Sequence, residues 1–278
     1  MSKLRVSAIQ RGCVYDGPGV RTTIFLKGCT LHCPWCCNPE NISLEQEWFF
    51  DDSKCIKRKG IASELCASCK RNDGDRAITE CPFSVAEPVC HDWLPSDLFL
   101  QIEKDKELFG KSGGVTFSGG EPLIQADALL PVLEMCKKQN VNIAFETTLY
   151  VGKKNIAAVI PYADIMIVDL KLQPEQVDIP NYMNCISENI DLIKKQGINV
   201  FYRLVFVNSL MPIKEKICKQ LKSLGVEKIE LLKCHHLGAR KYEKLNKKSV
   251  DFTADERLFQ NFSEYLQSVQ LKVTQLKV

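Results

Sequence analysis

Short apolar runs rich in β-branched residues alternate along the chain with longer segments of helical period. The short runs predict strands, and the longer segments predict amphipathic helices. We expect strands at residues 21–27, 114–117, 141–146, 165–170, 200–207 and 228–232. We expect helices at residues 96–106, 126–138, 185–195, 214–224 and 254–269. This alternation requires parallel strands joined by right-handed crossovers, so the pattern predicts an α/β fold.

The six strands predict an open, partial (β/α)6 TIM-like barrel, because a closed barrel of this type needs eight strands. In barrels built from parallel strands, functional residues gather at the carboxyl ends of the strands. Polar side chains end or follow several of the predicted strands, namely Glu146, Asp169, Lys171 and Lys233. We expect these side chains to meet at one end of the barrel.

Residues 45–91 interrupt this pattern and show neither a helical nor a strand period. The segment carries five cysteines: Cys55, Cys66, Cys69, Cys81 and Cys90. A segment this short buries little core, so we expect a bound metal or cluster to hold it together. The sequence therefore predicts a barrel domain formed by residues 1–44 and 92–278, and a small cysteine-rich insert at residues 45–91.

Composition narrows the class of protein. The formal charge of +3 argues against a nucleic-acid-binding surface. Lysines gather at residues 214–222 and 241–248, where we expect solvated helix faces, with a docking surface for an acidic partner as the alternative. The sequence offers no apolar stretch long enough to cross a membrane and no signal peptide, so we expect a cytoplasmic protein. Fourteen cysteines in that compartment indicate metal binding rather than disulfides.

Cys29, Cys33 and Cys36 form a C-x3-C-x2-C motif after the first predicted strand. Thiolates select iron–sulfur clusters or zinc over hard cations. Three cysteines on one loop can bind three corners of a [4Fe–4S] cluster and leave one iron open for a ligand. The alternatives are a structural zinc site, which usually needs two C-x2-C pairs, and three incidental thiols.

Further motifs follow in chain order: YDGPGVRT at residues 15–22, GGVTFSGGEP at 113–122, VDLK at 168–171 and ELLKCHHLGARKY at 230–242. Together with the cysteine motif, they resemble radical S-adenosylmethionine (SAM) enzymes, in particular the activating enzymes of glycyl radical enzymes. The resemblance spans nearly the whole chain. It implies the partial barrel, and it implies that SAM binds to the open iron of the cluster.

The resemblance also implies an activity. A reduced cluster would cleave SAM to methionine and a 5′-deoxyadenosyl radical, which abstracts hydrogen from a glycine Cα of a partner glycyl radical enzyme. The implied reductant is flavodoxin or ferredoxin. One alternative is a radical SAM enzyme that acts on a small molecule or peptide. The other is an iron–sulfur electron-transfer protein, which would need four ligands for each cluster and no SAM pocket.

By the same resemblance, the SAM contacts fall on Trp35, Asn38, Gly119, Gly120, Glu121, Lys171, Arg203 and His235. Trp35 would pack on the adenine, and Glu121 would accept hydrogen bonds from the SAM ammonium. For three of these residues a structural role is the alternative. Glu121 would then be a solvated side chain in a tight turn, Arg203 would form an ion pair at the barrel rim, and His235 would lie in the core.

The resemblance places two more groups of residues. A monovalent cation near the SAM carboxylate would be bound by Glu146, Thr147 and Asp169. The backbone of the substrate glycine would be held by the loop that contains Asp16, Gly17 and Gly19.

The insert resembles the ferredoxin-like insert of many family members only in part, through Cys66-x2-Cys69 and Cys81-Pro82. We expect one auxiliary [4Fe–4S] cluster, held by Cys66, Cys69, Cys81 and either Cys55 or Cys90. A single structural zinc and an insert without any cluster are the alternatives.

Overall fold

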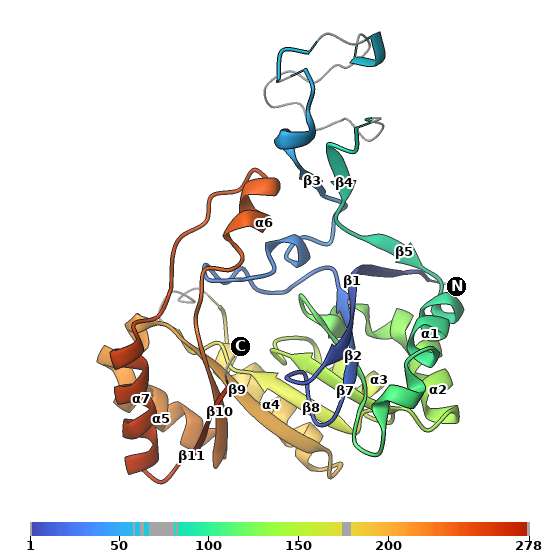
Figure 1. The fold of residues 1–278 in the computed structure, drawn as a ribbon. Coiled ribbons are helices and arrows are strands. Elements are labelled where there is room, and N and C mark those ends of the chain that lie inside the picture. The colour runs from blue at the N-terminus through green and yellow to red at the C-terminus, as the bar shows by residue number, and fades with distance from the viewer. Residues whose placement is uncertain are drawn as a thin grey trace.

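The computed structural model describes residues 2–57, 59–61, 64–66, 81, 83–173 and 179–276. Its body is a nine-stranded sheet in the order β11-β10-β9-β8-β7-β6-β2-β1-β5 (Figure 1). Seven consecutive strands pair in parallel. They are β2 (Arg21–Leu26), β6 (Gly114–Gly119), β7 (Asn142–Thr147), β8 (Ile165–Asp169), β9 (Asn199–Phe206), β10 (Lys228–Lys233) and β11 (Lys272–Leu276).

Six of these strands, β2 and β6–β10, coincide with the six predicted strands to within two residues at each end. The two edge strands, β5 and β11, do not pair with each other in the described part of the chain, so the barrel is open. The predicted α/β partial barrel is therefore confirmed. Strand β11 was not predicted, because as an edge strand it has no buried residue and so lacks an apolar signal.

The sheet continues beyond β2 with two antiparallel strands, β1 (Leu4–Cys13) and β5 (His91–Trp93). Neither strand was predicted. The register between β1 and β2 shifts twice, and β1 buries only Leu4, Val6 and Cys13, so its apolar alternation is weak. Because β5 returns the chain to β1, the segment between them leaves and re-enters the barrel at neighbouring strands.

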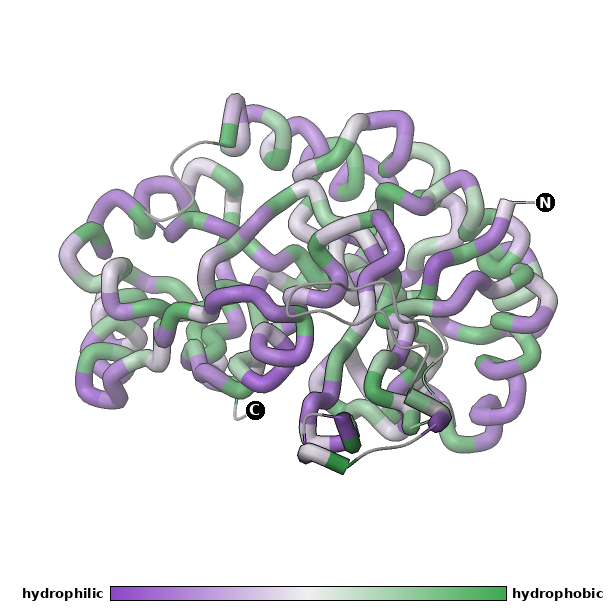
Figure 2. Tube along the Cα trace, turned by 90° about the horizontal axis from the view of Figure 1, so that it is seen from above, coloured by the Kyte–Doolittle hydropathy of each residue, from purple (hydrophilic) through white to green (hydrophobic). Residues whose placement is uncertain are grey.

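Seven α-helices are described: α1 (Pro95–Glu103), α2 (Ala126–Lys138), α3 (Lys153–Val159), α4 (Tyr182–Lys194), α5 (Lys214–Ser223), α6 (Ala239–Lys244) and α7 (Glu256–Ser268). Five follow the predicted helices, while the short α3 and α6 were not predicted. Seen from above, hydrophobic and hydrophilic positions alternate along the outer helices (Figure 2). Among the described residues, no helix is long and apolar enough to span a membrane.

The core lies between the sheet and its helices. Phe117 of β6 and Phe145 of β7 stack with ring centroids 5.5 Å apart, and both are fully buried. Leu129 and Leu133 of α2 are fully buried in the same cluster. Each such side chain contributes about 1.5–3 kcal/mol through burial, so the core fixes which strands are neighbours and where their carboxyl ends meet.

The cysteine-rich insert contains a two-stranded ribbon of β3 (Trp48–Phe50) and β4 (Ala86–Pro88) that projects from the barrel (Figure 1). Trp48 pairs with Pro88, and Phe50 pairs with Ala86. The expectation that residues 45–91 contain no strand is therefore wrong for these two short elements. Three residues are too few for a period to be recognised in the sequence. Residues 67–80, including Cys69, lie outside the described residues.

Candidate active site

The loop that follows β2 carries Cys29, Cys33 and Cys36. Backbone hydrogen bonds give it shape: Cys29 N donates to Ile42 O at 2.9 Å, and Cys36 N donates to Cys33 O at 3.0 Å. Leu31 N donates to the Cys29 sulfur at 3.4 Å, the kind of contact that stabilises a thiolate. All three cysteines line one cavity of about 280 Å³ at the carboxyl ends of the parallel strands.

The three thiols fit a cluster better than a single ion. One tetrahedral metal draws its sulfur ligands to about 2.3 Å from a single centre. Within the described part of the chain, no three His, Cys, Asp or Glu side chains are grouped closely enough for that. A [4Fe–4S] cluster binds each thiolate through a different iron and so spreads them apart. Burial raises the pKa of Cys29 to about 12, so a thiolate here needs a cationic partner such as iron.

Most of the predicted site residues meet at this cavity. Those that line it are Asp16, Trp35, Asn38, Gly119, Gly120, Glu146, Thr147, Asp169, Lys171 and His235. Four others do not line it: Gly17, Gly19, Glu121 and Arg203. Asn41 and Thr148 also line the cavity and were not predicted. Both lie within three residues of a predicted contact, which is the one signal that could have found them.

Several polar atoms around the cavity are buried without a hydrogen-bond partner among the described residues. They are Nε1 of Trp35, both amide atoms of Asn41 and Oδ1 of Asp169. Buried polar groups are nearly always hydrogen-bonded, so their common position calls for a polar ligand. SAM, with its ammonium, carboxylate, ribose and adenine, supplies both donors and acceptors. The residues present therefore fit this cofactor as well as the cluster.

Lys171 points its ammonium to Oδ2 of Asp169 at 2.5 Å, and its backbone N donates to the hydroxyl of Tyr182 at 2.7 Å. Burial disfavours the ammonium, but the charges of Asp169 and Cys33 outweigh burial and raise the pKa of Lys171. Lys171 therefore stays charged. It brings a fixed positive charge to the wall of the cavity, next to the cysteine loop.

Glu121 has a different place from the one expected. Its carboxylate is fully buried and accepts hydrogen bonds from the hydroxyls of Thr147 and Thr148, both at 2.7 Å. It also accepts from Thr148 N at 2.8 Å and from Leu123 N at 3.2 Å. These donors occupy the carboxylate, so Glu121 ties the end of β6 to the end of β7 beneath the cavity. Neither a SAM ammonium contact nor a solvated side chain agrees with this geometry.

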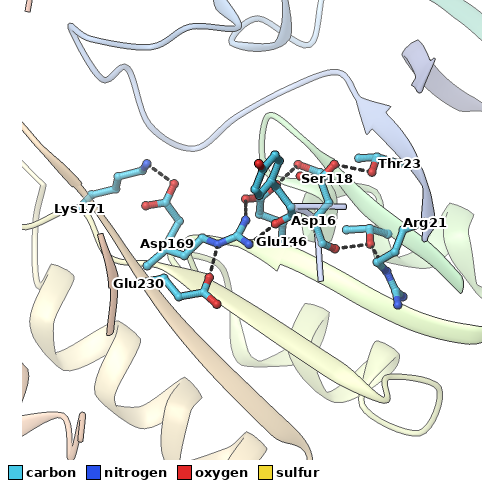
Figure 3. Close-up of polar contacts among 11 residues, drawn as sticks. Asp16, Arg21, Thr23, Ser118, Glu146, Asp169, Lys171 and Glu230 are labelled. Atoms are coloured by element: carbon cyan, nitrogen blue, oxygen red, sulfur yellow. Dashed lines mark hydrogen bonds and ion pairs between the residues drawn. The ribbon is translucent and has the colours of Figure 1, made fainter. Parts of the chain in front are cut away.

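Arg203 forms ion pairs with Glu146 and Glu230, the two carboxylates labelled in Figure 3, which agrees with the structural role that was its alternative. Its guanidinium lies 2.7 Å from Glu146 and 2.8 Å from Glu230, and it donates a third hydrogen bond to the carbonyl of Tyr15. The side chain is 6% exposed and does not reach the cavity. Glu146 accepts a further bond from the Ser118 hydroxyl at 2.6 Å. The carboxylates of Glu146 and Asp169, predicted to bind a monovalent cation, are thus paired with protein cations.

His235 lies half-buried at the cavity, after the end of β10. Its Nδ1 accepts a hydrogen bond from Leu237 N at 3.3 Å. This ring is therefore not a core histidine, and its placement agrees with the contact that the resemblance implies.

Three glycines allow close approach of backbone segments around the cysteine loop. A Cβ on Gly120 would lie 2.1 Å from the carbonyl oxygen of Gly28, and one on Gly119 would lie 2.3 Å from Leu26 N. A Cβ on Gly238 would lie 2.9 Å from the Cα of Cys37. Real Cβ atoms cannot come this close. The glycines therefore serve the packing of the cysteine loop, in addition to forming the cavity wall.

The turn between β1 and β2 folds inside the barrel. Gly17 and Gly19 have φ values of +122° and +74°, and a Cβ on Gly19 would lie 2.4 Å from Gly113 N, so glycine is required there. Asp16 accepts a hydrogen bond from the hydroxyl of Thr23 at 2.6 Å. Burial, together with the nearby charge of Glu146, raises the pKa of Asp16. The turn therefore presents one constrained carboxyl group to the cavity.

A short arm after β10, which includes α6, closes over the outside of the cysteine loop. Lys241 Nζ donates to Asn38 Oδ1 at 2.7 Å and to Glu40 Oε1 at 2.6 Å. Farther along the arm, Lys247 lies 2.6 Å from Glu47. Glu47 is also 2.8 Å from the fully buried ammonium of Lys27. These contacts join the arm to both ends of the cysteine loop.

The insert cysteines lie at different ends of the β3–β4 ribbon. Cys55 and Cys81 follow and precede the strand ends at Phe50 and Ala86, away from the barrel. Cys90 lies beyond the opposite end, where its thiol donates to Gln46 Oε1 at 3.1 Å. Cys66 is described and half-buried, while Cys69 is outside the described residues.

Comparison with known proteins adds independent findings. A model of a 4Fe-4S single cluster domain matches residues 15–75. The trans-4-hydroxy-L-proline dehydratase activating enzyme of Clostridioides difficile is 30% identical over 263 residues, covering 86% of this chain and 87% of that protein. The pyruvate formate-lyase 2-activating enzyme of Escherichia coli is 32% identical over 254 residues, covering 87% and 81%. The Streptococcus suis SuiB structure with precursor peptide SuiA shares the fold, with a TM-score of 0.50 at 12% identity over 67% of this chain and 43% of that one.

Proposed function

This chain belongs to the activating enzymes of glycyl radical enzymes, a family of radical SAM enzymes, and we propose that it converts one glycine of a partner enzyme into a glycyl radical. Its cofactors are a [4Fe–4S] cluster and SAM. When bound, they supply a 5′-deoxyadenosyl radical, which takes the hydrogen atom from the glycine Cα. The protein's task is to position these groups and to exclude water from them.

Each part of the cavity has a task in this proposal. Cys29, Cys33 and Cys36 hold the cluster and leave its fourth iron to SAM. The ammonium of Lys171 supplies a fixed charge for the SAM carboxylate, and Asp169 orients that ammonium. Trp35, whose Nε1 is unpartnered among the described residues, packs on the adenine. Glu121 and Arg203 do not touch the ligands in this scheme. They hold the strand ends that do.

The substrate is a backbone segment of a partner protein. The turn with Asp16, Gly17 and Gly19 lies across the cavity from the cysteine loop, and Asp16 faces that cavity. Its backbone is anchored by the Thr116 hydroxyl, which donates to Asp16 O at 2.7 Å. A fixed turn beside the SAM site can hold an extended glycine segment within reach of the reacting atom.

One observation carries the proposal: the C-x3-C-x2-C motif and the ends of five parallel strands, β6–β10, line one cavity. The test is anaerobic. The protein is reconstituted with iron and sulfide and reduced with dithionite, SAM is added, and 5′-deoxyadenosine is quantified. We expect release from the native chain and none from Cys33→Ala. The matched control is Cys185→Ala, a cysteine of α4 outside the cavity, which should release as much as the native chain.

A reconstituted protein with a reducible cluster could fail to release 5′-deoxyadenosine because cleavage waits for the partner. The assay is therefore repeated with co-expressed candidate glycyl radical enzymes, and the glycyl radical is sought by electron paramagnetic resonance. Absence of both products in every combination would overturn the proposal and favour an electron-transfer protein.

We propose that the insert at residues 45–91 is a separate unit beside the barrel of residues 1–44 and 92–278, and that it holds one auxiliary [4Fe–4S] cluster. Cys66, Cys69, Cys81 and Cys55 are the proposed ligands. The ribbon supports Cys55 over Cys90, because Cys55 and Cys81 share its outer end. Cys90 lies at the inner end and is bonded to Gln46.

The reductant in this proposal is flavodoxin or ferredoxin, and the compartment is the cytoplasm.

A further inference from the structure

Two lysine runs, at residues 214–222 and 241–248, are not used by the chemistry at the cavity. The structure separates them. Residues 214–222 lie on α5 in the outer helical layer, whereas residues 241–248 belong to the arm over the cysteine loop, beside β3 (Figure 1). The second run therefore lies next to the cluster-binding segment, and the first does not.

Some cations of the arm pair with acids beside the cysteine loop, and others do not. Its cations are Arg240, Lys241, Lys244, Lys247 and Lys248, against one acid, Glu243. Lys241 and Lys247 turn inward to Glu40 and Glu47. The other three, which we call the arm cations, have no hydrogen bond or ion pair within the described part of the chain. Arg240 and Lys248 are exposed, and Lys244 is half-buried near the carboxylates of Asp51 and Glu87.

The arm packs directly on the cysteine loop. Gly238 packs so closely that a Cβ there would lie 2.9 Å from the Cα of Cys37. A narrow space between the two segments is lined by Cys36, Cys37, Gly238 and Tyr242. A protein bound on the outside of the arm would therefore approach the cluster through a single short helix.

In the proposed function, the substrate binds at another part of the cavity, beside the turn that contains Asp16. The turn with Asp16 precedes Arg21, which pairs with Gly114 at the amino ends of the parallel strands. The arm follows Lys233, at a carboxyl end. A partner on the arm and a glycine segment at the turn can therefore be bound at the same time.

We propose that the arm cations form the docking surface for the acidic electron-transfer protein that reduces the cluster. This inference rests on the proposed function. The donor loses one electron and the cluster gains it, and no bond of this chain forms or breaks. Complementary charge steers such encounters and is weakened by salt, with a screening length of about 10 Å at 0.1 M.

The first test measures binding on the native, reconstituted protein with an oxidised flavodoxin as the probe. We expect amide hydrogen exchange to slow at residues 239–250 in the complex, and the Kd to rise steeply between low and high salt. Slower exchange on α5, or a Kd that does not change with salt, would overturn the proposal without the use of any variant.

The second test compares two triple variants. Arg240→Glu with Lys244→Glu and Lys248→Glu should weaken flavodoxin binding by roughly tenfold or more at 0.1 M salt. The matched control on α5, Lys216→Glu with Lys219→Glu and Lys222→Glu, should bind like the native chain. Equal binding by both variants would overturn the proposal. So would lost binding to phosphatidylglycerol vesicles with unchanged flavodoxin binding, because the face would then be a membrane contact.

Reduction by dithionite keeps the two proposals apart. The arm variant should release 5′-deoxyadenosine at the native rate with dithionite and more slowly with reduced flavodoxin. If the native chain released no 5′-deoxyadenosine with dithionite, the proposed function would fail. The binding measurements would still show whether flavodoxin binds at the arm cations. If the arm variant alone failed with dithionite, its fold would be at fault, and the exchange and salt measurements on the native chain would decide.

Discussion

Nη1 of Arg203 lies 2.7 Å from Oε1 of Glu146, so a carboxylate that lines the cavity is paired with a protein cation. The other carboxylate at this edge, Asp169, is paired in the same way with Lys171. The family resemblance implied that Glu146 and Asp169, with Thr147, would bind a monovalent cation. Each of the two carboxylates already has a protein cation beside it, which weakens the electrostatic attraction of an alkali ion to this place.

We therefore predict that SAM cleavage does not depend on the alkali cation. Exchange of sodium or potassium for choline should change the rate of 5′-deoxyadenosine formation by less than about twofold at constant ionic strength. Loss of the activity in choline, with recovery on addition of one alkali cation, would contradict this prediction.

Replacement of Arg203 should destabilise the protein. Arg203→Gln leaves Glu146 and Glu230 without their shared cation in a place where the arginine is 6% exposed, and breaking such a buried pair costs about 3 kcal/mol. The melting temperature should fall by roughly 6 °C. The matched control is Lys153→Gln, whose ion pair with Glu188 is more than half exposed and is worth at most about 1 kcal/mol. A similar small loss in both variants would contradict the network's role.

The sequence predicted the inner part of the fold because buried parallel strands carry continuous apolar runs. Strand β8, for example, is buried at four of its five positions. The same signal is absent from β11, which has none buried, and from α6, a single short helix with none buried. Their positions depend on contacts with distant segments, such as Lys241 with Glu40, that no local pattern records.

For the candidate site, the position of residues along the chain was predictable, as it was for the inner strands. Spacing identified the three cysteines, and strand ends identified Glu146, Asp169 and Lys171, because backbone topology decides which segments meet. The family resemblance supplied the other predicted residues that line the cavity. The direction of a side chain was not predictable. Glu121 and Arg203 stand in the motif positions but point to Thr147 and Glu146, which lie on other strands and come within hydrogen-bond distance only through the fold.

A methyl group at Gly238 should disturb the cluster. The backbone there has φ −73°, which alanine tolerates, so the only conflict of Gly238→Ala is its Cβ against Cys37 at 2.9 Å. We expect the cysteine loop to shift and the iron content after reconstitution to fall. Gly152→Ala is the matched control, because its Cβ would meet only Asn155 Oδ1, at 3.5 Å. Full iron content in Gly238→Ala would show that the arm does not constrain the loop.

The stability that the fold gains from the ion pairs of Glu47 with Lys247 and Lys27 should depend on pH. Burial raises the pKa of Glu47, but hydrogen bonds from Lys247 and Lys27 outweigh burial and lower it below the ordinary value. Because the pKa of Glu47 is lower in the folded state, its carboxylate stabilises the fold at pH values above the ordinary glutamate pKa. This stabilisation is lost as the pH falls through the lowered pKa.

Glu47→Gln should therefore lower the urea midpoint at pH 7, and its difference from the native chain should shrink as the solution is acidified below about pH 4.5. The measurement uses cluster-free protein, so that acid release of iron does not contribute. Glu87→Gln is the control, because its pair with Lys54 is exposed. A difference that stays constant with pH would contradict the ionic origin of the effect.

Iron content separates the two candidates for the fourth auxiliary ligand. Cys55 follows and Cys81 precedes the paired strand ends Phe50 and Ala86, whereas Cys90 lies beyond the other end of the ribbon and bonds to Gln46. The native chain should hold about eight iron atoms, Cys90→Ala about eight, and Cys55→Ala about four, because an auxiliary cluster with three ligands is lost more easily. If Cys90→Ala lost iron and Cys55→Ala did not, Cys90 would be the fourth ligand. If the native chain held about four iron atoms and one zinc, the insert would bind zinc in place of the auxiliary cluster. The matched pair is informative because both thiols are buried to a similar extent, 8% and 3% exposed, so a loss of packing alone would affect both variants alike.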